Sequence, residues 1–215
     1  MYAILEEPPI MENYADILFI DEVRKLQELD GTAEKYEKFY PQRTKAALDD
    51  SERQFIESRE SFYIASVSTT GWPYVQHRGG PKGFLKIIGD NKLGFIDYPG
   101  NRQFVTMGHA AKEARVALFL MDYERRTRLK VLGRLSMQHA KDTDVELCEL
   151  LSTPGQPRVD RVATIDVVAI DWNCPKYIPH WYTEQTIKDV VEKNVKPLRE
   201  ENERLKAQLA KIENT

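Results

Sequence analysis

The chain has 215 residues, of which 41% are hydrophobic and 30% charged, and its net charge is −3. This composition predicts a folded globular protein and excludes a disordered one. The small negative charge argues against a general affinity for nucleic acid, and no apolar run approaches the ~20 residues that cross a bilayer. We expect a cytoplasmic protein without a membrane segment, because the N-terminal sequence has no signal-like start and Cys148 and Cys174 are expected to be free thiols.

The N-terminal part of the chain predicts a helical preface, residues 1–60. Residues 1 to about 15 show no periodicity and indicate an extended arm. Asp21 is expected to cap the first short helix, which ends at Gly31. Ser51 is expected to open a later helix, because Ser51 and Gln54 have the spacing of a capping box. The expected helices cover residues 21–31, 33–39 and 51–59.

Alternating apolar and polar residues predict strands from residue 62 onward. Gly89-Asp90-Asn91 predicts a hairpin turn between two of them, and Gly133 predicts a bulge or a close backbone contact. Local connections with few crossover helices favour an antiparallel barrel over a doubly wound sheet. The fold class is therefore mainly β with peripheral α, its barrel domain covering residues 61–182. The expected strands are 62–68, 73–77, 84–88, 93–96, 115–121, 128–137 and 163–172, with a helix at 142–151.

Two polar loops rich in glycine and arginine flank the hairpin, at residues 76–80 and 100–103. Glycine allows close backbone approach, and arginine presents forked donors that match a phosphate. Asn101 is expected to cap a short helix that runs from Arg102 to about Gly108, where backbone donors beside Arg102 would favour an anion. The alternative is that both loops are ordinary turns with solvated arginines.

From Thr183 the pattern is helical, with Pro197 as a break or a first-turn residue. Apolar residues then alternate in steps of four and three, and Asn202 occupies a position where a polar residue commonly fixes two-stranded register. We expect residues 183–215 to self-associate as a short coiled coil; the alternative is an amphipathic helix that packs on its own domain. About three heptads would support a dimer held elsewhere rather than create one. The seam consists of Val191, Val195, Leu198, Asn202, Leu205, Leu209 and Ile212.

The runs PYVQHRGGP, GFLK and LGFIDYPGNRQ resemble the flavin-binding core of the pyridoxamine 5'-phosphate oxidase-like family, the FMN-binding split barrels. The resemblance covers roughly Asp16 to Trp181 and is most specific between Gly71 and Arg134. It implies an antiparallel split β-barrel with N-terminal helices and a C-terminal helix. It also implies a homodimer with FMN at the subunit interface, and a small molecule as substrate or electron donor.

Site residues follow from the same resemblance. Arg102 matches an arginine that contacts the FMN phosphate in the family, whereas Gln103 stands where pyridoxamine phosphate oxidases usually have lysine. Arg78 could replace that missing charge. Lys86 matches a lysine at the end of the strand that lines the flavin, and Arg128 matches a residue that typically reaches the flavin from the second subunit.

The other implied contacts lie at the flavin ring. Ile96 and Asp97 occupy positions that usually face the cofactor, and donors near the ring would tune its redox potential. No catalytic residue is assigned, and the four histidines have no metal-ligand spacing, so no metal is expected. The complete set of expected FMN contacts is Gln76, His77, Arg78, Gly79, Lys86, Ile96, Asp97, Asn101, Arg102, Gln103 and Arg128.

The chain departs from true pyridoxamine phosphate oxidases near its C-terminal end. Those enzymes have an Arg-x-His-Asp-Arg type signature that contacts the substrate, whereas the corresponding part of this chain has the sequence CPKYIPHWYTEQT. Vitamin B6 oxidation is therefore not expected. The sequence predicts an FMN-dependent oxidoreductase that passes electrons between flavin and an unidentified small molecule. The alternatives are a non-catalytic flavin or haem binding module, and a dimeric interaction protein with a decayed cofactor site.

Overall fold

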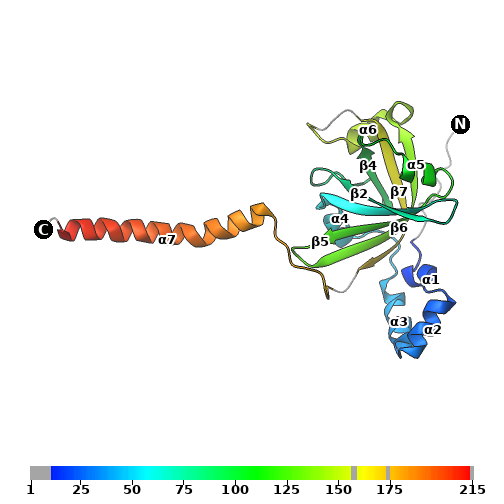
Figure 1. The fold of residues 1–215 in the computed structure, drawn as a ribbon, viewed down its shortest axis with the longest axis horizontal. Helices are drawn as coiled ribbons and strands as arrows, with labels where there is room; N and C mark the ends of the chain where they lie inside the picture. Colours follow the sequence, from blue (N-terminus) through cyan, green and yellow to red (C-terminus); the bar gives the residue numbers. More distant parts are fainter. Residues whose placement is uncertain (1–10, 156–158, 173–174, 214–215) are drawn as a thin grey trace. The chain divides into compact units, whose positions relative to one another are not determined.

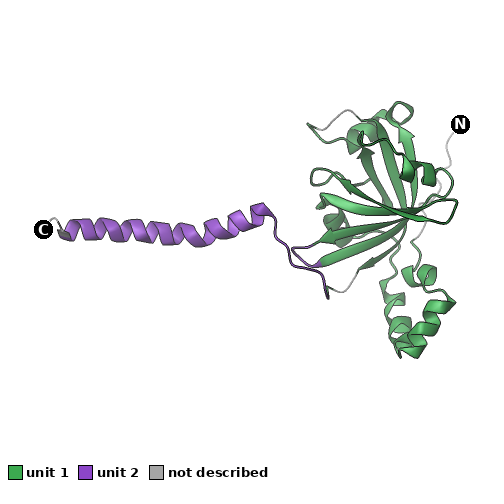
Figure 2. Ribbon diagram, viewed as in Figure 1, with its two compact units in different colours: residues 1–122, 127–175 green, residues 123–126, 176–215 purple. Residues whose placement is uncertain are grey.

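The computed structural model describes residues 11–155, 159–172 and 175–213 (Figure 1). The chain divides into two compact units, which Figure 2 colours separately. Unit 1 comprises residues 1–122 and 127–175, and unit 2 comprises residues 123–126 and 176–215. Most of the expected N-terminal arm and Cys174 lie outside the described residues, whereas Cys148 is a free thiol.

Unit 1 is built on a seven-stranded antiparallel sheet with the order β2-β1-β5-β6-β7-β4-β3. The predicted hairpin is confirmed, because β3 pairs with β4 across residues 89–91 and Ile88 N donates to Lys92 O at 2.9 Å. The sheet confirms the mainly β fold class. Its strands are β1 Ser61–Val67, β2 Pro73–Gly79, β3 Lys86–Ile87, β4 Lys92–Asp97, β5 Arg115–Asp122, β6 Thr127–His139 and β7 Arg161–Trp172.

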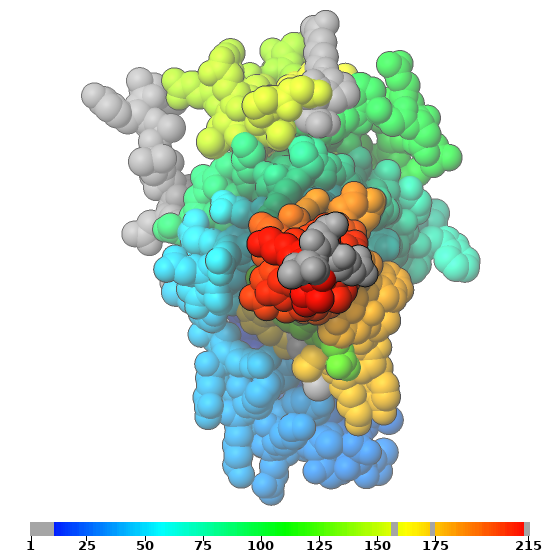
Figure 3. All heavy atoms as spheres, turned by 90° about the vertical axis from the view of Figure 1, so that its left-hand side faces the viewer, coloured from blue at the N-terminus to red at the C-terminus, as the bar shows by residue number. Residues whose placement is uncertain are grey.

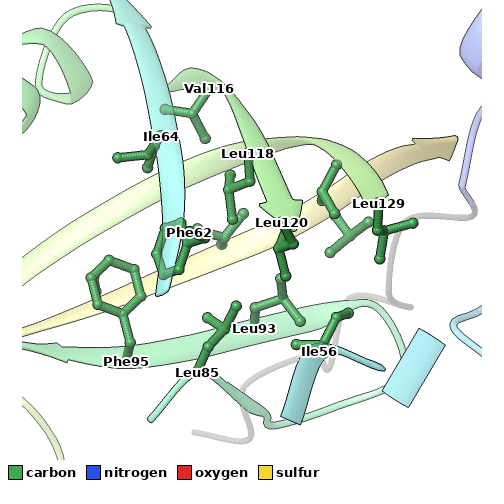
Figure 4. Close-up of a cluster of buried hydrophobic side chains, with 14 of the residues drawn as sticks. Ile56, Phe62, Ile64, Leu85, Leu93, Phe95, Val116, Leu118, Leu120 and Leu129 are labelled. Atoms are coloured by element: carbon green, nitrogen blue, oxygen red, sulfur yellow. The ribbon is translucent and has the colours of Figure 1, made fainter. Parts of the chain in front are cut away.

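The sheet curls around a hydrophobic core, as a split barrel requires. Phe62 on β1 and Phe95 on β4 have ring centroids 5.3 Å apart, although these strands are second and sixth in the sheet order. Phe84, just before β3, stacks on Phe62 at 5.7 Å. Figure 4 shows core side chains of β1, β4, β5 and β6 pointing toward one another. Within the described residues β2 and β3 are the free edges, and the predicted antiparallel split β-barrel is confirmed.

Gly133 marks the irregular point of the β6–β7 ladder. The register shifts between Leu132 and Gly133. A Cβ atom at this position would lie 2.5 Å from Ile165 Cγ2 and 2.8 Å from the backbone oxygen of Asp166. The sequence prediction of a bulge or close backbone contact is confirmed, and the close approach explains why the position carries glycine.

From residue 11 onward, four α-helices precede the sheet, and a 3₁₀ helix, Pro41–Arg43, separates the third from the fourth. The expected arm overlaps α1, which the sequence did not predict. Asp21 does not cap α2; Ile20 holds the N-cap position, and Asp21 is the first helical residue. The helices are α1 Tyr14–Leu18, α2 Asp21–Leu29, α3 Ala33–Phe39 and α4 Asp50–Glu57.

The capping box of α4 differs from the predicted one. Asp49 caps the helix by accepting from Ser51 N at 2.9 Å, and Glu52 Oε2 accepts from Asp49 N at 3.2 Å. The prediction that placed Ser51 at the cap is wrong, because the Asp49 carboxylate satisfies the first backbone donors and the helix has already begun at Asp50. Buried Glu52 also accepts from Lys45 Nζ at 2.7 Å and from Trp172 Nε1 at 2.5 Å, which fastens α4 to the end of β7.

The remaining helices of unit 1 are α5 Val105–Ala110 and α6 Val145–Leu151, and a 3₁₀ helix, Ala140–Asp142, precedes α6. Leu151 of α6 is buried in a cluster with Ile96 and Val162. Figure 3 shows α1–α3 at one end of unit 1 and α6 at the opposite end.

Unit 2 consists of the turn at residues 123–126, the segment from 176, and α7 Glu184–Glu213. Glu124 Oε1 accepts from Thr183 N at 2.8 Å and from Thr186 Oγ1 at 2.6 Å, which satisfies donors at the start of α7. Both expectations for Pro197, a break or a first-turn residue, are wrong, because Pro197 lies inside α7. The helix continues through it, although proline removes one backbone hydrogen bond and its ring crowds the carbonyl four residues earlier. No helix of the described chain is long and apolar enough to cross a bilayer.

Candidate functional site

A pocket of about 210 Å³ opens in unit 1 between β2, the end of β4, and the segment that leads into α5. Strand alternation explains its β2 wall, because successive side chains of a strand point to opposite faces. Tyr74, Gln76 and Arg78 are half-buried, while the residues between them are exposed. The pocket is lined by Tyr74, Gln76, Arg78, Asp97, Tyr98, Gly100, Asn101, Arg102, Gln103, Phe104, Val105, Thr106, Met107, Met137 and Arg161.

One buried carboxylate orders two arginines in this pocket. Asp97 ends β4 and pairs with Arg161, the first residue of β7. Arg161 Nε donates to Asp97 Oδ2 at 2.8 Å, and Arg78 Nη1 donates to Asp97 Oδ1. Arg102 also lines the pocket, so its lining carries three arginines and one carboxylate. The pocket is positively charged and suits an anionic ligand.

Arg78 has a donor that its salt bridge with Asp97 does not use. Its Nε atom is buried and has no hydrogen-bond partner within the part of the chain that the structure describes. A buried polar group without a partner costs about 1–3 kcal/mol, so such groups are rare in folded proteins. An acceptor in the pocket would satisfy this donor.

The segment before α5 has a strained backbone. Arg102 has φ 59° and Phe104 has φ 55°, which is the left-handed region that residues other than glycine seldom adopt. The predicted helix from Arg102 is wrong, because these left-handed residues delay the helix until Val105, with Phe104 as its N-cap. Asn101 Oδ1 instead accepts from Gln103 N at 3.2 Å and shapes the loop. Strained residues of this kind cluster at ligand sites.

Two further contacts fix the pocket wall. Thr106 is buried, and its Oγ1 donates to Gln76 Oε1 at 2.9 Å, which ties α5 to β2 and turns the amide nitrogen of Gln76 outward as a donor. Beside them, Ser66 Oγ and His109 Nδ1 are 2.9 Å apart. The orientation of Gln76 is therefore set before any ligand binds.

The structure brings six of the predicted site residues together: Gln76, Arg78, Asp97, Asn101, Arg102 and Gln103. The other five lie elsewhere in the chain. His77 and Gly79 occupy the opposite face of β2, and the His77 ring lies 5.5 Å from that of Tyr63. Lys86 Nζ donates to Ser152 O at 3.4 Å.

Ile96 and Arg128 also lie outside this pocket. Ile96 is buried against α6, on the face of β4 opposite Asp97. Arg128 alternates with buried Leu129 on β6, so it lies on the outer face of the sheet, its guanidinium 5.6 Å from the Phe119 ring centroid. Like Arg78, it has a buried Nε atom that no described residue contacts by a hydrogen bond.

The sequence missed several lining residues, above all Tyr74, Thr106 and Arg161. Tyr74 shares the two-residue spacing of Gln76 and Arg78, which is a signal that the sequence contains. Arg161 reaches the pocket only through the pairing of β4 with β7, which the sequence does not reveal. Among the described residues, no group of three or more His, Cys, Asp or Glu side chains is placed to hold a metal ion.

The fold and the pocket agree with a family assignment. The family model described as Pyridoxamine 5'-phosphate oxidase matches residues 48–167, which is more than half of the chain, and the chain belongs to this family. The resemblance identified from the sequence is thereby confirmed. No curated protein matches the chain.

Several solved structures are similar to the chain. HupZ of Group A Streptococcus is 12% identical with a TM-score of 0.48, covering 63% of this chain and 100% of that one. An FMN-binding protein from Syntrophomonas wolfei is 12% identical with a TM-score of 0.45, covering 68% and 97%. A putative pyridoxamine 5'-phosphate oxidase from Lactobacillus delbrueckii is 17% identical with a TM-score of 0.44, covering 58% and 93%. At such identities and scores these likenesses do not bear on function.

Proposed function

We propose that the chain binds FMN in the pocket between β2, β4 and residues 98–107, and that it is an FMN-dependent oxidoreductase. The observation that carries the proposal is the buried Nε–H of Arg78, which lacks a partner among the described residues in a pocket that also contains Arg102 and Arg161. A phosphate monoester offers several acceptor oxygens and about two negative charges at neutral pH. It matches both the missing acceptor and the excess of positive charge.

The lining residues fit the two parts of FMN. Arg102, on the strained and exposed loop, would hold the phosphate together with Asn101 and Gln103. Arg78 would add a second guanidinium, since Asp97 fixes the orientation of its side chain. The aromatic rings that line the pocket, those of Tyr74, Tyr98 and Phe104, offer apolar surface for the rest of the cofactor.

Bound FMN would supply the electron transfer, and the chain would orient it. Gln76 offers an amide donor whose direction the Thr106 bond sets, and a donor at the ring edge favours the more negative, reduced form of a flavin. Asp97 already holds the Arg78 guanidinium at the pocket wall before a ligand arrives, so little reorganisation of this side chain is needed. The family assignment of residues 48–167 supports the same reading.

We further propose a homodimer in which each chain completes the site of the other. The pocket of one chain is smaller than the ~300–1,000 Å³ usual for such ligands. On the outer face of β1 and β2, Tyr63, Val67 and Val75 are 42%, 42% and 61% exposed. Val75 lies opposite Ala65, which stands between Tyr63 and Val67 on the neighbouring strand, and such a group of exposed apolar side chains is typical of an interface. His77 and Arg128 also lie on the outer face, where a residue donated to a partner's site must lie.

Turnover separates the oxidoreductase from a binding module. The purified chain, loaded with FMN, should oxidise a reduced nicotinamide steadily when an electron acceptor is present. Tight FMN binding without turnover across a panel of reductants would contradict the oxidoreductase and leave a flavin carrier.

The dimer is tested by light scattering. Val75→Glu places a charge on the apolar face and should raise the dimer dissociation constant by about tenfold or more. Leu29→Glu, on exposed α2, is the matched control and should leave it unchanged. An unchanged dimer dissociation constant in the Val75 variant would exclude a contribution of this face to the interface.

A further inference from the structure

The helix α7 carries an apolar seam that the function proposed above does not use. Described by itself, unit 2 leaves all but one of the seam side chains exposed, with Leu198 69%, Leu205 46% and Leu209 59% exposed; Val195 is half-buried. Leucine side chains exposed along one stripe of a long helix indicate a surface that another helix covers. The residues of this α7 seam are Val191, Val195, Leu198, Asn202, Leu205, Leu209 and Ile212.

The seam has the pattern of a two-stranded coiled coil. Its steps of four and three place Val195, Asn202 and Leu209 at a positions of a heptad, and Leu198 and Leu205 at d positions. Val195 at a with Leu198 at d is the β-branched and leucine combination that favours two strands, and Asn202 at a is the polar residue that fixes register and oligomer state, whereas Leu209 at a with Ile212 at d departs from this combination. We propose that α7 pairs with the α7 of a second copy of this chain, as a parallel coiled coil in register.

Asn202 selects the partner and the orientation. In a parallel pair in register, each a residue faces the same residue of the other helix, so the two Asn202 amides donate to and accept from each other. In an antiparallel pair, a residues face d residues, and the amide would be buried against an apolar side chain without a partner. Pairing with the α7 of a second copy, in the parallel orientation, therefore satisfies the hydrogen-bonding groups of Asn202.

Charges beside the seam agree with the parallel arrangement. Glu201 precedes Asn202 at a g position, and Lys206 follows Leu205 at an e position. In a parallel pair these positions lie next to each other across the interface, so each Glu201 meets the Lys206 of the partner helix, twice by symmetry. Within one helix, Glu201 accepts from Arg204 at 2.7 Å and Lys206 donates to Glu203 at 2.9 Å. Such exposed ion pairs within one helix are weak, so they do not prevent Glu201 and Lys206 from pairing across the interface instead.

Pro197 does not interrupt the seam. The helix is continuous from Glu184 to Glu213, and Pro197 takes the c position, on the side away from the pairing surface. The seam spans about three heptads, a length that adds stability to a dimer with a second interface. The pairing rests on α7 alone and not on the FMN site.

Cysteine cross-linking in the full-length chain tests the proposal. In a Cys148→Ser, Cys174→Ser background, single cysteines replace Leu198, Leu205 or Ile212 along the seam. Glu200→Cys and Ala207→Cys, at f positions on the outer side, are matched controls. All three seam variants should form a disulfide dimer under mild oxidation, at about tenfold or more the rate of the controls.

The alternatives give different results. Cross-linking at only one seam position would indicate an antiparallel pair, and equal rates at seam and control positions would exclude pairing; either outcome overturns the proposal. FMN absorbance of the same samples reports on the pocket independently, so failure of the coiled coil and failure of the FMN site are distinguishable.

A charge exchange tests the register. Glu201→Lys in the Leu205→Cys chain should slow cross-linking several-fold, because Lys206 of the partner helix then meets a like charge. Adding Lys206→Glu should restore the rate. An unchanged rate in the single variant would contradict the parallel register.

Discussion

Asp97 and Arg161 lie opposite each other in the β4–β7 ladder, and Arg161 Nε donates to Asp97 Oδ2 at 2.8 Å. Both side chains are buried, with 6% and 7% of their surface exposed. Because Arg78 donates to the other carboxylate oxygen, Asp97 fixes two guanidinium groups in the pocket wall. One carboxylate on β4 therefore orders two of the three arginines that line the pocket, one from β2 and one from β7.

Replacing this carboxylate should destabilise the chain. Asp97→Asn keeps the shape but leaves two buried guanidinium groups without a counter-charge, and breaking such a buried pair costs about 3–5 kcal/mol. The free energy of unfolding from urea denaturation at neutral pH, without FMN, measures the loss. Asp90→Asn, an exposed residue 4.0 Å from Arg53, should cost under about 1 kcal/mol. Equal effects of the two substitutions would show that the Asp97 network is not stabilising.

The phosphate should depend on Arg102. Arg102→Ala removes a charge-assisted hydrogen bond, so FMN affinity should fall by about 1.5–3 kcal/mol, which is roughly 10- to 150-fold. Riboflavin, which lacks the phosphate, should bind the variant and the parent chain equally. Titration calorimetry with both ligands measures this, with Arg24→Ala on α2 as the control. A parallel loss of riboflavin affinity would show that the substitution disturbs the loop instead.

Gly133 should not tolerate a side chain. The Cβ of Gly133→Ala would meet Ile165 Cγ2 at 2.5 Å and the backbone oxygen of Asp166 at 2.8 Å, and the backbone atom cannot rotate away. We expect a loss of about 1–3 kcal/mol, seen as a lower melting temperature. Gly89→Ala is the matched control, because its nearest neighbour, Lys92 Cβ, is 3.6 Å away. Similar melting temperatures for the two variants would contradict the close approach.

The stability of the N-terminal helices should fall in alkaline solution. The Tyr40 ring packs 5.0 Å from that of Phe19, and burial, with the nearby Asp171 carboxylate, raises the pKa of Tyr40 to about 12. Because the folded-state pKa lies above the unfolded value of 10.0, this contribution is complete below pH 10 and is lost as the pH rises through about 12. Tyr40→Phe keeps the ring and removes the ionisation, so its melting temperature should fall less over this range. Parallel pH profiles for the two chains would contradict the raised pKa.

Helices and strands were predicted well where a short stretch of sequence determines the structure. Two-residue alternation located the strands, and the turn at residues 89–91 follows from its composition. The start of α5 could not be predicted, because the left-handed backbone at Arg102 and Phe104 is set by the loop as a whole and not by residue preference. The cap of α4 was misplaced for a simpler reason. Asp49 and Ser51 are only two residues apart, and both have side chains that can cap a helix.

The candidate site was predicted in part. The Gly-Arg loops and the family resemblance together indicated Gln76, Arg78 and Arg102, all of which line the pocket. Arg161 could not be predicted, because its partner Asp97 is 64 positions away and only the β4–β7 register brings them together. His77 was predicted because it lies next to Gln76 and Arg78 in the sequence. Successive residues of a strand point to opposite faces of the sheet, so His77 lies on the face of β2 away from the pocket.

The visible absorption spectrum of the purified chain, taken after mixing with FMN and desalting, decides whether the pocket binds FMN. A flavin spectrum should persist through desalting, with an absorbance proportional to the protein concentration, and it should be weaker in the Arg102→Ala chain. A chain that remains colourless after FMN addition would contradict the FMN site, and the oxidoreductase proposal with it.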